Sequence, residues 1–221
     1  MKNFLLKNYF YERKRRIKYK KVFDKTALLE WKRNIKTMKT VKNKRQLQSY
    51  FNYAKNLKYS HNNSKVYFSH PLRVANLAFK ISKYSTSPKN LVILGLFHNI
   101  LETSNEKISF LEKLIGKKIL RQIKILTVNR NKQWNLQYKA KYYRNISLQN
   151  KNTRLIKIID KLDNLFTIGL NSSKIIRKRY ISEIEQHILP MVKKDLPILV
   201  KYFDGLIKQS YILGYYGSKR D

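Results

Sequence analysis

The sequence of 221 residues contains no cysteine and no long apolar run. Without cysteine, the chain cannot form a disulfide framework or a cysteine-ligated zinc or iron–sulfur site. Its longest apolar run, Leu91 to Phe97, is much shorter than the roughly 20 residues that a transmembrane helix needs. We therefore expect no transmembrane segment, and either a soluble protein or one that charge holds at a surface.

Acidic residues are also scarce, at 13 Asp and Glu against 49 Lys and Arg, which gives a formal net charge of +36. So many like charges repel one another unless a polyanion neutralises them. Hydrophobic residues make up 43% of the chain and aromatic residues 13%, which is enough to build a packed core. The composition therefore predicts a folded protein whose partner is nucleic acid or, as the second choice, an anionic membrane.

Glycine and proline are scarce, at 6 and 4 residues, whereas Lys, Asn, Ile, Tyr and Phe are abundant. AT-rich codons encode those abundant residues, so we expect an organellar or reduced genome as the source. Asp and Glu also have AT-rich codons, and base composition alone therefore does not explain why they are rare. Selection for positive charge is the remaining explanation.

Positive charge is densest in residues 1–45, which hold 17 Lys and Arg against three acidic residues. Aromatic residues are interleaved with the basic ones, and this mixture suits RNA because cations neutralise phosphates while aromatic rings stack on unpaired bases. We predict that this segment is a basic RNA-binding extension. The predicted RNA-binding residues are Arg13, Lys14, Arg15, Arg16, Lys18, Lys20, Lys21 and Arg33. The alternatives are a solvated charged helix, a mitochondrial targeting segment and an amphipathic helix on an anionic membrane.

Helical periodicity dominates the rest of the chain, and no alternating strand pattern of useful length is present. Ser87-Pro88 predicts the start of a buried helix that continues over residues 91–101. The run from Ser109 to Glu112 fits a capping box at the start of a further helix. We therefore predict an all-α fold, with a compact helical domain over residues 46–205 and a C-terminal tail over residues 206–221.

Three of the four histidines, His61, His70 and His98, fall within one 38-residue stretch and are followed at a distance by Asp160. Residues four apart share a helix face, which places Glu102 beside His98 and, on a later helix, Asn164 beside the aspartate. Imidazoles and a carboxylate that converge can hold a divalent metal, and a nearby glutamate can orient a water for attack on phosphorus. The same spacing also fits side chains that hydrogen-bond across a helical core, where loss of one partner leaves a buried polar group unsatisfied.

Four ordered motifs carry a family resemblance. They are Tyr67 to Ala75, Leu96 to Thr103, Ile108 to Thr127 and Leu155 to Leu165. Together they resemble the RelA/SpoT-type HD-domain hydrolases over residues 46–200. The resemblance implies an HD-domain helical bundle and a manganese-dependent enzyme that removes the 3'-pyrophosphate from (p)ppGpp.

This chain departs from that family at several of the positions that the resemblance implies to be functional. Asn99 stands where the family has a metal-binding aspartate, and its neutral amide is a weaker donor for a hard cation. The family's Glu-Asp pair for water activation becomes Glu102 and Thr103. His61 and Asn62 stand where the family has an Arg-Lys pair that contacts the nucleotide.

These departures predict a pseudoenzyme with no catalytic residue, no bound metal and no other cofactor. The vestigial catalytic positions would be Glu102, Thr103 and Asn164. The vestigial metal positions would be His70, His98, Asn99 and Asp160.

We therefore predict a non-catalytic, RNA-binding structural component of a large ribonucleoprotein, with the mitochondrial ribosome as the preferred assembly. Its partners would be ribosomal RNA and neighbouring ribosomal proteins. Its location would be the mitochondrial matrix, an inference from composition alone. The alternative is an active metal-dependent pyrophosphohydrolase for (p)ppGpp or another nucleotide, with Mn²⁺ as its cofactor. A third hypothesis is peripheral binding to an anionic membrane through the basic N-terminus.

Overall fold

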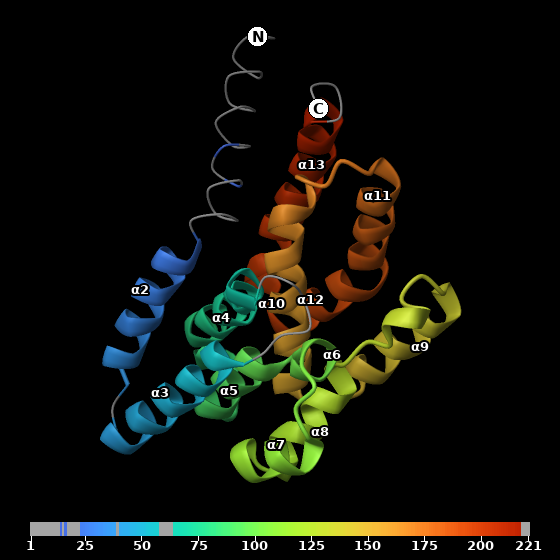
Figure 1. Cartoon of the computed structure of the whole chain (residues 1–221). Helices are drawn as coiled ribbons and strands as arrows, with labels where there is room; N and C mark the ends of the chain where they lie inside the picture. The colour runs from blue at the N-terminus through green and yellow to red at the C-terminus, as the bar shows by residue number, and fades with distance from the viewer. Residues whose placement is uncertain (1–13, 15, 17–22, 39, 58–63, 218–221) are drawn as a thin grey trace. The chain divides into compact units, whose positions relative to one another are not determined.

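The computed structural model describes residues 14, 16, 23–38, 40–57 and 64–217, which form helices joined by short turns, with no β-strand among them (Figure 1). The all-α prediction is therefore confirmed. The α-helices of this part of the chain are α2 (Phe23–Lys36), α3 (Val41–Asn56), α4 (Ser64–Lys80), α5 (Pro88–Phe97), α6 (Ile100–Thr103), α7 (Ile108–Ile115), α8 (Lys117–Leu126), α9 (Leu136–Ser147), α10 (Lys151–Ile168), α11 (Lys174–Glu183), α12 (Leu189–Asp195) and α13 (Val200–Gly217). The shorter segments are the 3₁₀ turns η1 (Ser82–Tyr84), η2 (Arg130–Lys132) and η4 (Pro197–Leu199) and the π-helical turn η3 (Ile184–Ile188).

The chain divides into two compact units, and helix α10 contributes to both. The central unit comprises residues 26–160, and the terminal unit comprises residues 1–25 together with 161–221. The domain boundaries predicted after residues 45 and 205 both lie inside helices, α3 and α13. The chain instead passes from one compact unit to the other after residues 25 and 160.

Helix α2 belongs to the core of the central unit, although it lies within the segment predicted as an RNA-binding extension. Trp31 of α2 is 1% exposed, and its ring stacks on Phe51 of α3 with 5.2 Å between ring centroids. The same indole meets Phe79 of α4 edge-on at 5.5 Å. Burial of a tryptophan against two aromatic rings contributes on the order of 2 to 3 kcal/mol. The packed domain therefore begins before residue 45.

Helix α5 is the predicted buried helix. Its residues from Leu91 to Phe97 are all buried, and α3, α4 and α8 pack around it. Ser87 is the N-cap residue and Pro88 occupies the first helical position, as predicted, although the serine side chain makes no capping hydrogen bond. A helix that is apolar on every side can pack against several neighbours at once, which makes α5 the centre of this unit.

The buried helix ends at Phe97 instead of continuing to Leu101, and the short helix α6 begins after a turn. At this turn, His98 Nδ1 lies 2.7 Å from the carbonyl oxygen of Gly95. That oxygen would accept the backbone N–H of Asn99 in a continuing helix, so the imidazole competes with the helical hydrogen bond.

Helices α4 and α5 approach closely at Gly95. A Cβ atom at this glycine would lie 3.1 Å from the Cα and 3.3 Å from the backbone nitrogen of Ala75, which is closer than ordinary van der Waals contact. Only glycine therefore permits this approach without a backbone shift. His70 and His98 lie on these two segments, so the close contact brings their side chains within reach of each other.

The capping box predicted for Ser109 to Glu112 is wrong. Helix α7 begins at Ile108 with Lys107 as its N-cap residue, so the serine lies inside the first turn, where no side chain caps the helix. Gly116 separates α7 from α8 with a φ of +85°, in the left-handed region that favours glycine.

In the terminal unit, α11 and α12 are joined by η3, and α11 and α12 each pack against α13. Lys161 Nζ lies 2.6 Å from Glu183 Oε1, which links α10 to α11. Helix α13 continues to Gly217, so most of the predicted C-terminal tail is helical, and Leu206 and Ser210 within it are buried. Residues 218–221 lie outside the described part of the chain.

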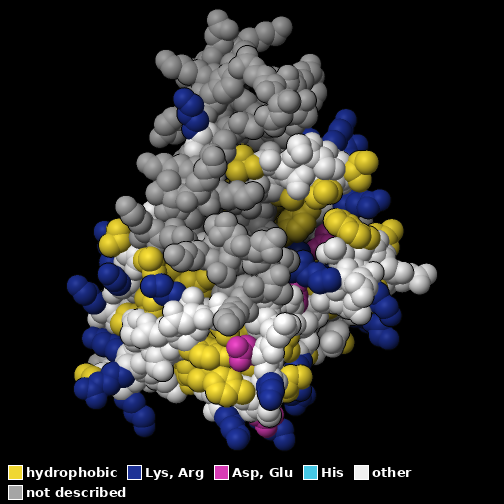
Figure 2. Space-filling model, in the orientation of Figure 1, with side chains coloured by type: hydrophobic (Ala, Val, Ile, Leu, Met, Phe, Trp, Pro, Cys, Tyr) yellow, Lys and Arg dark blue, Asp and Glu magenta, His cyan; other side chains and the backbone are white. Residues whose placement is uncertain are grey.

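Basic residues dominate the surface. On the face shown in Figure 2, Lys and Arg side chains far outnumber Asp and Glu side chains. The central unit contains 28 Lys and Arg but only five Asp and Glu. Most positive charge in this unit therefore has no acidic residue of the same unit to offset it. No helix in the described part of the chain is long and apolar enough to span a membrane.

Candidate functional site

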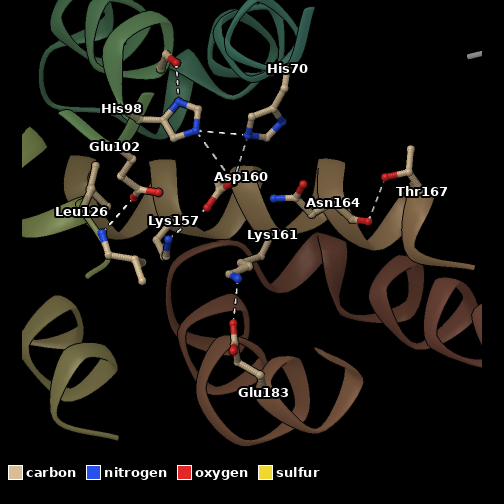
Figure 3. Close-up of polar contacts among 12 residues, drawn as sticks. His70, His98, Glu102, Leu126, Lys157, Asp160, Lys161, Asn164, Thr167 and Glu183 are labelled. Carbon is tan, nitrogen blue, oxygen red and sulfur yellow. Dashed lines mark hydrogen bonds and ion pairs between the residues drawn. The ribbon is translucent and has the colours of Figure 1, made fainter. Parts of the chain in front are cut away.

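Three of the predicted vestigial metal positions converge inside the central unit (Figure 3). His70 comes from α4, His98 from the turn after α5, and Asp160 from α10. The Nε2 atom of His70 lies 3.2 Å from Nε2 of His98 and 3.2 Å from Oδ1 of Asp160. The Nε2 atom of His98 lies 3.7 Å from the same carboxylate oxygen. The fold thus joins three polar groups from three helical segments that are distant in the sequence.

The backbone contact of His98 directs one ring nitrogen toward this cluster. Its Nδ1–H donates to the Gly95 carbonyl, so a neutral ring with that tautomer presents the lone pair of Nε2 to His70 and Asp160. Burial lowers the pKa of His98 to about 4, although the Asp160 carboxylate favours the protonated ring. His98 is therefore neutral near pH 7, as a metal ligand must be.

The three donor atoms fit a divalent cation. Ligand atoms that share one ion at about 2.1 Å lie roughly 3 to 3.5 Å apart. The separations of 3.2, 3.2 and 3.7 Å in the cluster are close to that spacing. Two imidazole nitrogens and one carboxylate oxygen are donors that suit zinc, iron or manganese. His70, His98 and Asp160 would supply three ligands to such an ion.

The fourth predicted metal position, Asn99, is buried at 7% exposure and is the N-cap residue of α6. Its backbone carbonyl accepts a hydrogen bond from Thr103 Oγ1 at 2.9 Å. A neutral amide at this position supplies no charge to offset that of a bound cation. The chain therefore offers such an ion one carboxylate, from Asp160, among these four positions.

Lys157 neutralises much of the charge of that carboxylate. One helical turn before Asp160 on α10, its Nζ lies 3.0 Å from Asp160 Oδ2, and both side chains are less than 10% exposed. Burial alone would raise the pKa of Asp160, but Lys157 and the two imidazoles hold it well below its usual range. The buried ammonium and carboxylate therefore form an ion pair inside the protein.

Tyr142 of α9 packs against this buried lysine. Lys157 Nζ lies 5.2 Å from the centroid of the Tyr142 ring, and the tyrosine hydroxyl donates to the carbonyl of Leu126. Burial alone would lower the pKa of Lys157, but Tyr142 and Asp160 outweigh it and raise the pKa above its ordinary value. Lys157 is therefore charged near pH 7.

Both carboxylate oxygens of Glu102 are engaged in contacts away from the cluster. Its Oε1 accepts the backbone N–H of Val128 at 2.8 Å, and its Oε2 lies 2.7 Å from Nη2 of Arg130. We expected Glu102 and His98 to share one helix face, but the turn between α5 and α6 separates them. The structure therefore uses Glu102 to hold the segment after α8.

The other two positions that the sequence predicted as vestigial catalytic residues lie on α6 and α10. Thr103 is fully buried, and its hydroxyl donates to the carbonyl of Asn99. Asn164 is half-buried, one helical turn after Asp160 as predicted. Its backbone carbonyl accepts a hydrogen bond from Thr167 Oγ1 at 3.1 Å.

The predicted RNA-binding residues have different environments. Lys14 and Arg33 are exposed, whereas Arg16 has no exposed surface. The Arg16 guanidinium donates to the carbonyl of Phe166 at 3.0 Å and to Oε1 of Gln209 at 2.5 Å, and lies 4.8 Å from the Phe166 ring centroid. Burial thus removes Arg16 from the surface on which the RNA-binding prediction depends. Arg13, Arg15, Lys18, Lys20 and Lys21 lie outside the described residues, as do His61 and Asn62.

Three residues of the site were not singled out from the sequence. Lys157 lies three positions before Asp160 on a helical pattern, and this spacing was a usable signal for an ion pair. Arg130 and Tyr142 lie beside the site because of how the chain folds after α8. Local sequence patterns do not predict such contacts.

Comparisons with known proteins agree with this architecture. The model of the HD-domain family matches residues 67–165, a span that contains His70, His98 and Asp160. Among solved structures, the chain is similar to one described as a metazoan ortholog of SpoT that hydrolyses ppGpp, with 19% identity and a TM-score of 0.60. That similarity covers 78% of this chain and 97% of the other. A comparison with curated protein sequences finds no significant match. The chain therefore has an HD-domain fold, as predicted.

Proposed function

We propose that this protein is a non-catalytic HD domain that binds RNA as a structural component of a large ribonucleoprotein, with the mitochondrial ribosome as the preferred assembly. One observation carries the loss of catalysis: both oxygens of Glu102 are engaged, one by the Val128 N–H and one by Arg130. A general base must direct a lone pair at the water that it activates, and these two contacts orient the Glu102 carboxylate toward Val128 and Arg130. Glu102 in this state holds two segments together instead.

The neighbouring positions support the same conclusion. Residue 103 is a buried threonine whose hydroxyl is bonded to the backbone, so it supplies no second carboxylate. Residue 99 is an asparagine, and the remaining carboxylate of the cluster, Asp160, is paired with Lys157. The cluster therefore resembles a satisfied polar core, which would persist because removal of one partner is strongly destabilising.

The charge distribution supports binding to a polyanion. Three of the five acidic residues of the central unit form ion pairs within it: Glu30 with Lys80, Glu102 with Arg130, and Asp160 with Lys157. These pairs offset only a small part of the 28 Lys and Arg of that unit. Release of counterions from RNA phosphates would give such a surface affinity without a sequence-specific motif.

A second candidate function is a metal-dependent phosphohydrolase that acts on (p)ppGpp or a related nucleotide. It is favoured by the convergence of His70, His98 and Asp160, whose donor atoms fit a divalent cation. A metal ion bound there would polarise a phosphoryl oxygen and lower the pKa of a water. The chain's own residues would hold that ion and, once freed from Arg130, Glu102 would be the available base.

The two candidates are separated by assays on the purified full-length chain. It is incubated with Mn²⁺ and (p)ppGpp, and released pyrophosphate is measured beside the Asp160→Asn variant as a matched control. We expect equal, background release from both proteins. Mn²⁺-dependent release by the unaltered chain that is lost in Asp160→Asn would overturn the non-catalytic proposal and establish the hydrolase.

The RNA-binding part is tested by the salt dependence of affinity for ribosomal RNA fragments. We expect the logarithm of the affinity to fall linearly with the logarithm of salt concentration, with a slope of about 0.7 to 0.9 per neutralised phosphate. Removal of residues 1–45 is unsuitable as a control, because it would delete the buried Trp31. The exposed pair Lys14→Ala and Arg33→Ala is the better variant, and it should reduce the slope. A flat salt dependence, or sedimentation apart from ribosomal particles, would contradict the proposal.

A further inference from the structure

One segment of the central unit is rich in basic residues and contains no acidic residue. Residues 113–159 hold 13 Lys and Arg but no Asp or Glu. The segment includes α8, η2 and α9, and much of it lies at the surface. An anion that approaches this surface meets no acidic side chain of the same segment, so the local potential is positive.

An exposed tryptophan lies in the middle of this segment. Trp134 follows η2 and is 56% exposed, whereas the only other tryptophan, Trp31, is 1% exposed. A large aromatic side chain at the surface gives up part of the free energy that full burial would contribute. Tryptophan is enriched in binding interfaces, where a partner covers the ring.

The turn that carries Trp134 is held by hydrogen bonds on both sides. The backbone N–H of Asn129 donates to the Tyr138 hydroxyl at 2.8 Å, and Asn135 Oδ1 caps α9 by accepting from the Tyr138 N–H at 2.8 Å. The N–H of Asn131 donates to the side chain of Asn129 at 3.0 Å. An ordered turn of this kind presents the indole with little loss of conformational entropy when a partner binds.

Basic side chains flank this indole along the chain. Lys132 precedes it in η2 and is exposed, whereas Arg130 of the same turn is already paired with Glu102. Lys141 and Arg144 follow on the exposed face of α9, opposite the buried Tyr142. We call Lys132, Trp134, Lys141 and Arg144 the Trp134 surface.

We propose that the Trp134 surface binds unpaired RNA, with the indole stacked on a base and the flanking cations on phosphates. Unpaired bases stack on aromatic rings, whereas bases within a duplex are already stacked on one another. A protein partner could bury the exposed Leu136, but it would not require so much positive charge. The absence of acidic residues from the segment therefore favours RNA over a protein as the partner. This inference rests on the proposed RNA-binding function and assigns it a site.

Intrinsic tryptophan fluorescence provides a direct test, because the chain has two tryptophans and Trp134 is the exposed one. The full-length chain is titrated with a single-stranded oligouridine and with an RNA duplex of equal length. We expect the single strand to quench the fluorescence and the conservative Trp134→Phe variant to abolish that quench. The phenylalanine keeps an aromatic ring, so this variant should retain most of the affinity.

Affinity for the same two RNAs then measures the stacking contribution. Trp134→Ala should weaken binding of the single strand by about 5- to 100-fold, as expected for loss of one base–aromatic stack, and change duplex binding less than about twofold. Tyr202→Ala, which removes an aromatic side chain that is 49% exposed on α13, is the matched control and should leave both affinities unchanged.

The outcomes distinguish this site from the general function. If the unaltered chain binds RNA but shows no quench, and Trp134→Ala binds the single strand normally, the Trp134 surface is not the site while RNA binding stands. If the unaltered chain binds neither RNA, both proposals fail. Quenching by a co-purifying protein but not by oligouridine would overturn the RNA assignment in favour of a protein interface.

Discussion

In the interior of the central unit, the Lys157 ammonium lies 3.0 Å from the Asp160 carboxylate, and His70 and His98 complete the group. At the surface of the same unit, a large excess of Lys and Arg has no acidic residue to offset it. The interior pairs its charges within the fold, whereas most basic residues of the unit have no acidic residue of that unit to offset them. Under the proposed function, the polar cluster contributes stability and the surface binds RNA.

The physical reason for the contrast is the difference in solvation. A buried charge without a partner is strongly destabilising, so an interior ion pair must be complete in the folded chain. A surface charge is solvated and screened, so an unpaired lysine there is tolerated until a polyanion arrives. Substitutions in the two regions should therefore separate stability from RNA affinity.

The largest effect is expected for Asp160→Ala, which leaves the buried Lys157 ammonium without its partner. We expect a loss of about 3 to 5 kcal/mol in the free energy of unfolding, measured by urea denaturation. The exposed Asp204→Ala is the control and should change stability by less than about 0.5 kcal/mol. The double variant Lys157→Met with Asp160→Leu should recover at least half of the loss, and a loss below about 1 kcal/mol in Asp160→Ala would contradict this account.

Gly95→Ala should have the next largest effect, because its Cβ would lie 3.1 Å from the Cα of Ala75 and force α4 and α5 apart. We expect a loss of roughly 2 kcal/mol, measured as a shift in the urea midpoint. Gly205→Ala on α13 is the matched control, since its Cβ would meet nothing within 4 Å. This second variant should be neutral or stabilising by up to about 1 kcal/mol. Equal effects of the two substitutions would argue against the close approach as the cause.

Two basic residues from the same run, Arg16 and Lys14, should behave in opposite ways. Arg16→Ala leaves the Phe166 carbonyl and the Gln209 side chain without their donor, and we expect a loss of about 1 to 2 kcal/mol in thermal or urea unfolding. The exposed Lys14→Ala should leave stability unchanged and reduce the salt dependence of RNA binding. A loss of RNA affinity in Arg16→Ala without a loss of stability would reverse this assignment.

The smallest effect on stability is expected for the double variant Lys141→Gln with Arg144→Gln, because both side chains are exposed on α9. The free energy of unfolding should stay within about 0.5 kcal/mol of the unaltered chain. The log–log slope of RNA affinity against salt should fall by up to about 2, one for each lost phosphate contact. The comparison is a double variant of two exposed lysines on α12, Lys193→Gln with Lys194→Gln, which changes a different basic surface. An equal reduction by both pairs would mean that charge acts without a preferred surface.

Several features of the fold could be predicted from local pattern. The apolar residues from Leu91 to Phe97 indicated the buried helix α5, and the four-residue spacing of Asp160 and Asn164 indicated that they lie one turn apart on a helix, α10. These predictions succeeded because helix formation and the direction of a side chain depend on residues within a few positions. Residue identity alone also marked positions 99 and 103 as lacking a carboxylate.

Other features depended on contacts between distant segments. The helix break at His98 follows from its bond to Gly95, and the position of Glu102 follows from Arg130 and Val128. From the sequence, Arg16 was predicted to be one cation of an exposed basic run. In the structure, its guanidinium donates to Phe166 and Gln209. No local pattern reports which distant residue will supply a partner.

The sequence by itself determined the excess of positive charge, the helical class, the absence of cysteine chemistry and the absence of a carboxylate at positions 99 and 103. These are properties of composition and short-range periodicity, and folding does not alter them. The tertiary structure decided which charges remain available. It paired Asp160 with Lys157, bound Glu102 to Arg130 and buried Arg16, while Trp134 and its basic neighbours stayed at the surface. Electrostatic and hydrogen-bond energies fall steeply with distance and with solvent exposure, so the function of each charge depends on its position in the folded chain.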